Sequence, residues 1–288
     1  MKPQIKIYDT AFAHSNGGSF GTGDLNIHPT HFEWYRGKDT VGDIAVITES
    51  CFNDVDSVKE KIKIALIMEP PCIRPDAYVK ICKPEFRNKF DYILTHQRDL
   101  LSTDPKFRHY TYAGCWIYPN KRVLHNKTKN ISIIASSKRS TMGHILRHQV
   151  ISCYRDRIDG IFGNGYDFVP NKIEALKDFR YSIVIENETS DDWFTEKLID
   201  CFVTGTIPIY WGTKNIGDYF NTDAIIQFSE FHELEKIIKT ATQEFYDSKL
   251  IYNGPISNNF LLARKYYILP EDLIWTNFLK EIYETTNK

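Results

Sequence analysis

The sequence predicts an α/β protein with two domains, each built on a parallel β-sheet. Short runs rich in β-branched and aromatic residues alternate with segments of helical pattern along the chain. The expected strands are almost continuously apolar, which is typical of parallel sheets covered on both faces. A polar stretch, YPNKRVLHNKTKN (118–130), separates two groups of strands. The economical architecture is therefore two α/β halves with a cleft between them.

The expected elements follow the chain in order. The first group of strands is 4–9, 43–49, 62–68 and 90–96. The second group is 131–136, 181–186, 206–211 and 224–228. Helical patterns cover 143–158, 171–179, 192–205 and 270–286. The last of these begins with Pro270 followed by acidic residues, which is a favourable helix start.

Composition limits the classes of function. The 288 residues carry 36 Lys and Arg against 37 Asp and Glu, so the net charge of −1 attracts no nucleic acid. A bound anion must therefore meet a local cluster of positive charge. The chain start lacks the apolar run of a signal peptide, and no run of 18 apolar residues predicts a membrane span. Six scattered cysteines without a CxxC pair indicate reduced thiols, so we expect a cytoplasmic protein.

The segment DWFTEKLIDCFVTG (192–205) combines an apolar helical stripe with a second, polar face. At about 100° per residue, that second face carries Trp193, Glu196, Lys197 and Asp200. The helix directly follows a strand, so its N-terminus lies at the carboxyl end of the sheet, where α/β proteins bind ligands. Unpaired N–H groups and Lys197 favour an anion there, whereas the Glu196 carboxylate suits hydroxyl groups such as those of a ribose. The alternative is a solvated polar face with Trp193 packed on a neighbour.

The stretch YSIVIENETSDDWFTEKLIDCFVTGTIPIYWG (181–212) resembles the donor-binding motif of the α-1,3/1,4-fucosyltransferases, glycosyltransferase family 10. The similarity extends over about residues 131–231. It implies a GT-B fold, with two Rossmann-like domains facing a central cleft. It also implies an inverting transfer of L-fucose from GDP-fucose to a glycan hydroxyl. The corresponding domains are 1–125 on the acceptor side, 126–268 for the nucleotide sugar, and a C-terminal helix, 269–288, that packs back on the first domain.

The resemblance also implies roles for single residues. Arg147, with Arg139 as its competitor, clamps the diphosphate together with Lys197. Glu196 holds the ribose, Asn187 belongs to the donor site, and Trp193 lies against the donor where the family usually has Tyr.

Glu69 is the expected catalytic base. It ends the run KIALIME just before two prolines, and it resembles the family's N-terminal Glu. A carboxylate at the mouth of an apolar strand can have its pKa raised towards the working range by desolvation. The other interpretation of Glu69 is a carboxylate that caps a turn.

We expect no metal and no other cofactor, because Arg and Lys can stabilise a departing diphosphate and no DxD-like pair ends a strand. The expected partners are a nucleotide sugar and a glycan acceptor. Two alternatives stay open: another nucleotide sugar, such as UDP-xylose, or a non-catalytic module that binds a sugar or a nucleotide.

Overall fold

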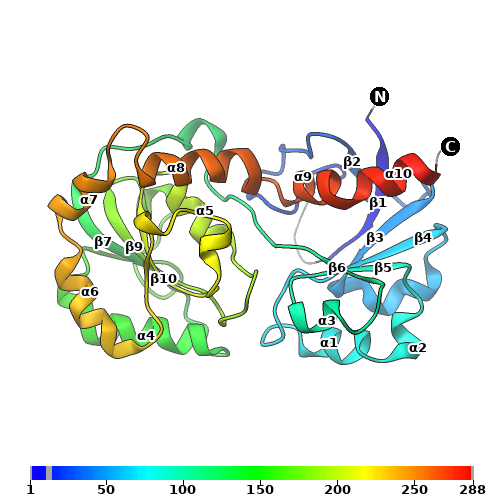
Figure 1. Ribbon diagram of the computed structural model, residues 1–288, viewed down its shortest axis with the longest axis horizontal. Coiled ribbons are helices and arrows are strands. Elements are labelled where there is room, and N and C mark those ends of the chain that lie inside the picture. Colours follow the sequence, from blue (N-terminus) through cyan, green and yellow to red (C-terminus); the bar gives the residue numbers. More distant parts are fainter. Residues whose placement is uncertain (1, 11–14, 287–288) are drawn as a thin grey trace. The chain divides into compact units, whose positions relative to one another are not determined.

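The computed structural model describes residues 2–10 and 15–286, which form two compact units (Figure 1). Unit 1 comprises Met1–Tyr112, Asp191–Trp193 and Leu269–Lys288. Unit 2 comprises Ala113–Ser190 and Phe194–Ile268. The chain passes from the first unit to the second ahead of the polar stretch 118–130. The three-residue segment Asp191–Trp193 belongs to unit 1 although unit 2 flanks it on both sides.

Unit 1 contains a six-stranded parallel sheet in the order β2-β1-β3-β4-β5-β6. Its strands are β1 (Gln4–Tyr8), β2 (Glu33–Tyr35), β3 (Ile44–Thr48), β4 (Ile62–Leu66), β5 (Tyr92–Thr95) and β6 (Phe107–His109). The four predicted strands are all present. Strands β2 and β6 were not predicted, because each has only three residues, too few to show the hydrophobic pattern of a strand.

Helices cover both faces of this sheet. One face packs against η1 (Glu49–Ser57), α1 (Pro75–Ile81) and α2 (Pro84–Arg87), and α3 (Arg98–Leu101) follows β5. The other face packs against α9 (Pro270–Ile274), the π-helical turn Trp275–Leu279 and α10 (Lys280–Thr286). The predicted C-terminal helix is therefore present. The buried Glu271 anchors it, because its carboxylate accepts hydrogen bonds from Ser19 Oγ at 2.8 Å and from Phe20 N at 2.6 Å.

Unit 2 contains a five-stranded parallel sheet in the order β11-β10-β9-β7-β8. Its strands are β7 (Lys129–Ile134), β8 (Gly160–Phe162), β9 (Phe179–Ile185), β10 (Ile207–Trp211) and β11 (Ile226–Gln227). The four predicted strands are present, and β8, with three residues, was missed. The chain leaves β7 for β8 on one side and then returns to β9 on the other. The carboxyl ends of β7 and β9 therefore form the switch point at which such sheets bind ligands.

The two faces of this sheet are covered by different helices. Along β9, Tyr181, Ile183 and Ile185 point into one core, which also holds side chains of α4 (Met142–Tyr154) and α6 (Leu234–Thr240). Val184 points into the opposite core, which holds α5 (Glu196–Phe202). This alternation is the period of two expected for a strand buried on both sides. The remaining helices are α7 (Gln243–Lys249) and α8 (Pro255–Leu262), and Figure 1 shows α8 beside α5.

Two helix predictions need correction. The range 171–179 contains only a four-residue 3₁₀ turn, Lys172–Ala175, because β9 already begins at Phe179. The helix expected over 192–205 covers only Glu196–Phe202. Asp192 has a positive φ of 60°, which no right-handed helix accommodates, and Thr195 caps the helix by accepting from the N–H of Lys197.

Gly143, in the first turn of α4, allows this helix to approach the end of β9. A Cβ atom at this position would lie 1.7 Å from the carbonyl oxygen of Glu186. The Gly143 N–H also donates to the carbonyl of Asn187 at 3.1 Å. Only glycine fits this approach, and the approach sets how close α4 lies to the carboxyl end of β9.

We predict that Gly143→Ala lowers the free energy of unfolding by about 1–3 kcal/mol, the usual cost of overpacking. Urea unfolding followed by tryptophan fluorescence measures this change. Gly217→Ala is the matched control, because among the described residues its added Cβ would have one neighbouring atom, Thr222 Cγ2 at 3.3 Å. Equal stability of Gly143→Ala and wild type would show that α4 can withdraw from β9 at no cost.

Candidate functional site

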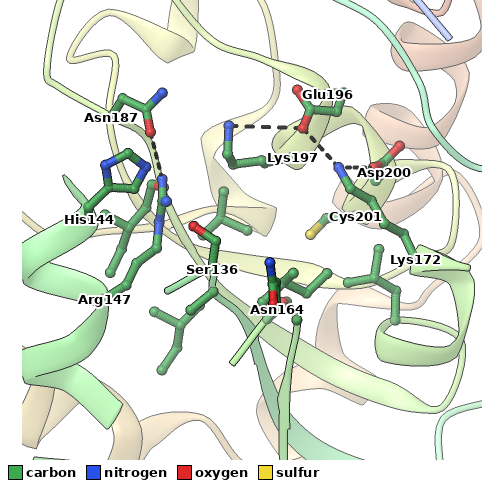
Figure 2. A pocket seen from close by; sticks show the side chains of 18 of the residues that line it. Ser136, His144, Arg147, Asn164, Lys172, Asn187, Glu196, Lys197, Asp200 and Cys201 are labelled. Carbon is green, nitrogen blue, oxygen red and sulfur yellow. Dashed lines mark hydrogen bonds and ion pairs between the residues drawn. The ribbon is translucent and has the colours of Figure 1, made fainter. Parts of the chain in front are cut away.

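A cavity with a volume of about 320 Å³ opens in unit 2 at the carboxyl ends of β7 and β9 (Figure 2). Ile134 and Ser136 line it from the end of β7, Gly163 and Asn164 follow β8, and Asn187 follows β9. Its charged lining consists of Lys138, Arg147, Lys172, Glu196, Lys197 and Asp200. The cavity therefore lies at the switch point of the sheet and combines cations with carboxylates.

Arg147 projects from α4 and is 6% exposed. Its Nε donates to the carbonyl oxygen of Ile185 at 2.9 Å, and Nη2 donates to the same oxygen and to Asn187 Oδ1 at 3.1 Å. Within the described residues, Nη1 makes no hydrogen bond. Burial lowers the pKa of the guanidinium, but Arg stays charged at any physiological pH. The guanidinium is thus fixed at the end of β9 by hydrogen bonds, and Nη1 can still donate to a ligand.

Lys197 is held by a buried carboxylate that the sequence analysis did not single out. Its Nζ donates to Glu186 Oε2 at 3.1 Å and to Thr195 Oγ1 at 2.9 Å. Glu186 is fully buried at the end of β9 and also accepts from the N–H of Thr195 at 2.9 Å. An ammonium group has three donors, so one stays available to an anion in the cavity.

Glu196 forms the opposite end of the charged lining. Its Oε1 lies 2.8 Å from Lys172 Nζ and 3.9 Å from Lys197 Nζ. Lys172 also contacts Asp200 Oδ2 at 3.2 Å. Burial acts to raise the pKa of Glu196, but the charges of the two lysines outweigh it and lower the pKa to about 2. Glu196 is therefore an ionised hydrogen-bond acceptor at every physiological pH.

The two ends of the cavity differ in charge. In Figure 2, Arg147, His144 and Asn187 lie on one side, and Lys172 with Asp200 lies on the other. Burial and the positive charge of Arg147 are the main causes that lower the pKa of His144 to about 4. Besides burial, the charges of Arg147, Lys138 and Lys197 lower this pKa, and the same positive charges favour an anionic ligand. One end of the cavity can therefore take an anion, while the other offers carboxylate oxygens to hydroxyl groups.

The structure brings four of the predicted residues together, namely Arg147, Asn187, Glu196 and Lys197. Arg139 is exposed and does not line the cavity, so Arg147 is the arginine at this site. Prediction missed Lys172, Glu186 and His144. Only Glu186 had a usable signal, as an acid that ends an apolar strand.

The prediction that Trp193 shares a helical face with Glu196 and Lys197 is wrong. Trp193 precedes α5, is 1% exposed and packs in the core of unit 1, and it does not line the cavity. Its indole N–H donates to the carbonyl of Met68 at 3.0 Å. The preceding Asp192 is fully buried, and Arg98 Nη2 donates to its Oδ1 at 2.9 Å. These contacts hold the segment in a conformation that excludes a helix.

Glu69 lies in unit 1, three residues beyond the end of β4. Its backbone N–H and its carbonyl oxygen are both hydrogen-bonded. The N–H donates to Glu49 Oε1 at 3.1 Å, and the carbonyl accepts from the Tyr78 hydroxyl at 3.0 Å. Glu49 is 4% exposed and also accepts from the N–H of Met68 at 3.2 Å. The carboxylate that caps this turn is therefore Glu49, and the side chain of Glu69 is not needed for that purpose.

Among the described residues, no group of three or more His, Cys, Asp or Glu side chains is arranged to hold a metal ion. In the same part of the chain, no helix combines the length and the apolar character that a membrane crossing requires.

Residues 124–250 match the family model described as glycosyltransferase family 10 (fucosyltransferase), C-terminal part. Alpha-(1,3)-fucosyltransferase FucT of Helicobacter pylori is 29% identical over 109 residues, which cover 36% of this chain and 22% of that protein. GDP-fucose protein O-fucosyltransferase 3 of Gallus gallus is 34% identical over 101 residues, which cover 32% of this chain and 21% of that protein. The matched region spans about a fifth of the length of these relatives.

Solved structures are similar over most of the chain. One described as an α1,3-fucosyltransferase aligns with 100% of this chain and 90% of its own, with a TM-score of 0.56 and 14% identity. Another, described as the α1,3-fucosyltransferase with GDP, aligns with 98% of this chain and 91% of its own, with a TM-score of 0.54 and 16% identity. At such identities the likeness concerns the fold. It confirms the predicted GT-B class, with a parallel-sheet α/β fold in each unit.

Proposed function

We propose that this chain, whose residues 124–250 match the glycosyltransferase family 10 model, transfers L-fucose from GDP-fucose to a hydroxyl group of a glycan acceptor with inversion. The observation that carries the proposal is the division of one cavity into an anion-binding end and a carboxylate end. A nucleoside diphosphate sugar has matching parts, because it joins a diphosphate to a ribose. The cavity volume of about 320 Å³ falls within the range of small-molecule sites.

Each end has a defined task in this proposal. Arg147 Nη1 and the remaining donor of Lys197 bind the diphosphate, and the positive potential around His144 adds to this attraction. The ionised Glu196 accepts hydrogen bonds from the ribose hydroxyls. Asn187 contributes by fixing the guanidinium of Arg147.

The transfer is a single displacement at C1 of the fucose. The acceptor oxygen forms a bond to C1 as the bond from C1 to the β-phosphate oxygen breaks, and GDP leaves. Arg147 and Lys197 stabilise the charge that develops on the departing diphosphate. The acceptor proton must pass to a base, and the two carboxylates that line the cavity are unsuited. Glu196 has a pKa of about 2. Asp200 is 1% exposed and is held by Lys172 and the backbone N–H of Trp116. We assign this step to Glu69, as the family resemblance implies.

Two other functions are distinguished by experiment. A different donor, such as UDP-xylose, would use the same diphosphate contacts. The name of the Gallus gallus relative includes GDP-fucose and supports guanine as the base. A non-catalytic module would bind the nucleotide without transferring the sugar.

We predict that GDP raises the melting temperature of the protein more than UDP or CMP does. A nucleotide present at 100 times its Kd stabilises the folded state by about 2.7 kcal/mol. Differential scanning fluorimetry with each nucleotide measures the shift. Lys197→Gln keeps a donor for Glu186 but removes the charge, so it should lose most of the shift. Lys177→Gln, a surface position paired with Glu174, should retain it. A shift with UDP alone would identify a different donor, and no shift with any nucleotide would contradict the proposal.

We predict that Glu69→Gln binds GDP with unchanged affinity but transfers fucose about 100-fold more slowly, the scale of general-base catalysis. The backbone of residue 69 keeps its contacts to Glu49 and Tyr78, so the fold should be retained. Calorimetric GDP binding and initial rates on the same preparation separate the two effects. Glu85→Gln, an exposed position of unit 1, is the control. Unchanged turnover in Glu69→Gln would remove this residue from the mechanism.

We further propose that transfer needs no metal, because cationic side chains serve the diphosphate. Fucose transfer should therefore persist in excess EDTA at a rate within about twofold of the untreated enzyme, since no group that acts on the diphosphate is removed. Loss of activity on chelation, restored by Mn²⁺, would contradict this.

A further inference from the structure

Lys172 lines the cavity, and the function proposed above assigns it no direct role in binding. It lies in the 3₁₀ turn before β9, 24 residues ahead of Glu196 in sequence. Its Nζ is 2.8 Å from Glu196 Oε1, more than 1 Å closer than the ammonium of Lys197 at 3.9 Å. Lys172 is therefore the main partner of Glu196.

Lys172 is itself fixed before any ligand binds. Its Nζ lies 3.2 Å from Asp200 Oδ2, and the other oxygen of Asp200 accepts from the N–H of Trp116 at 2.7 Å. The same ammonium group lies 5.1 Å from the centre of the Trp116 ring, in a cation–π contact. Asp200 is 1% exposed and one helical turn beyond Glu196. The four side chains form one connected cluster along one side of the cavity.

A direct role for Lys172 in diphosphate binding does not fit these contacts. Two carboxylates accept hydrogen bonds from its ammonium group, which also lies over the Trp116 ring. Lys197 instead donates to one carboxylate and one hydroxyl, and Arg147 donates to a carbonyl and an amide oxygen. These contacts favour a role for Lys172 in holding Glu196 and not in binding the diphosphate. An ionised carboxylate has about four acceptor sites, so the bond from Lys172 leaves room for two hydroxyl groups.

We propose that Lys172 is a positioning residue, which orients the Glu196 carboxylate towards the 2′- and 3′-hydroxyls of the ribose and so makes the site select ribonucleotide over deoxyribonucleotide donors. The inference rests on the proposed function, in which Glu196 holds the ribose. Without Lys172, the flexible Glu196 side chain would be ordered only when the ligand binds. The entropy cost of that ordering would then weaken the affinity for the ligand.

The electrostatics agree with this geometry. Burial acts to lower the pKa of Lys172, but Glu196 and Asp200 outweigh it and raise the pKa above its usual value. Lys172 thus stays charged wherever Glu196 is ionised, and the orienting contact persists over the whole physiological range.

The test compares binding of GDP with binding of 2′-deoxy-GDP by isothermal titration calorimetry. Wild type should bind GDP about 10- to 100-fold more tightly, the range for a hydrogen bond to a charged group. In Lys172→Met, GDP loses its contacts through both hydroxyls, whereas 2′-deoxy-GDP loses only the contact through its 3′-hydroxyl. GDP affinity should therefore fall more than 2′-deoxy-GDP affinity, and the ratio should approach one. Lys172→Arg keeps the charge and should keep the preference. The surface variant Lys177→Met should resemble wild type.

Lys172→Met leaves Asp200 without its cation, so the double variant Lys172→Met/Asp200→Asn is measured in parallel. The asparagine retains an oxygen for the Trp116 N–H, and this variant should show the same loss of preference. An unchanged ratio in either folded variant, or an equal loss of affinity for both nucleotides, would overturn the positioning role. Equal binding of GDP and 2′-deoxy-GDP by wild type would also overturn it, yet leave the proposed function intact. Absence of GDP binding by wild type would instead overturn the proposed function and this inference together.

Discussion

The buried carboxylate of Glu186 is the contact on which the geometry of the site depends. It ends β9 and accepts hydrogen bonds from the backbone and hydroxyl of Thr195 at 2.9 Å, as well as from Lys197. Placing a full charge in the interior is costly, and the cost is offset only when such partners are present. The same carboxylate therefore fixes where α5 starts and where its first cation lies. Once Thr195 is in place as the cap, Glu196, Lys197 and Asp200 take their positions from the helical repeat.

The approach of α4 completes the site from the other side. Because Gly143 has no side chain, the first turn of α4 lies against the backbone of Glu186 and Asn187. One turn further along, Arg147 reaches the carbonyl of Ile185. The last carbonyls of a parallel strand have no ladder partner beyond its end, and the guanidinium supplies one. Strand β9 thus positions one cation through a carboxylate and the other through a carbonyl.

Sequence reasoning was successful where a single segment determines the outcome. The apolar strands could be predicted because continuous burial leaves a continuous pattern, and the spacing of Glu196, Lys197 and Asp200 follows from one helix. Sequence reasoning was unsuccessful where contacts between segments distant in sequence determine the structure. Lys172 contacts Glu196 across 24 positions, from a 3₁₀ turn where a helix was expected. Trp193 was misplaced because Asp192, just before it, has a positive φ that ends any helix, and Asp192 is held by Arg98 across 94 positions.

Glu49 and Glu186 show the same device in the two units. Each is a buried glutamate directly after a strand, Glu49 after β3 and Glu186 after β9. Glu49 accepts from backbone N–H groups 19 and 20 positions further along the chain, and Glu186 from one that is 9 positions further. Loops at the carboxyl ends of parallel strands lack the ladder bonds that order the strands themselves. A carboxylate is well suited to replace them, since its two oxygens can bind successive N–H groups. The residues it orders in this way include Glu69 in unit 1 and Thr195, which leads into Glu196 and Lys197, in unit 2. Both proposed functional segments are therefore ordered by a buried carboxylate at the end of a strand.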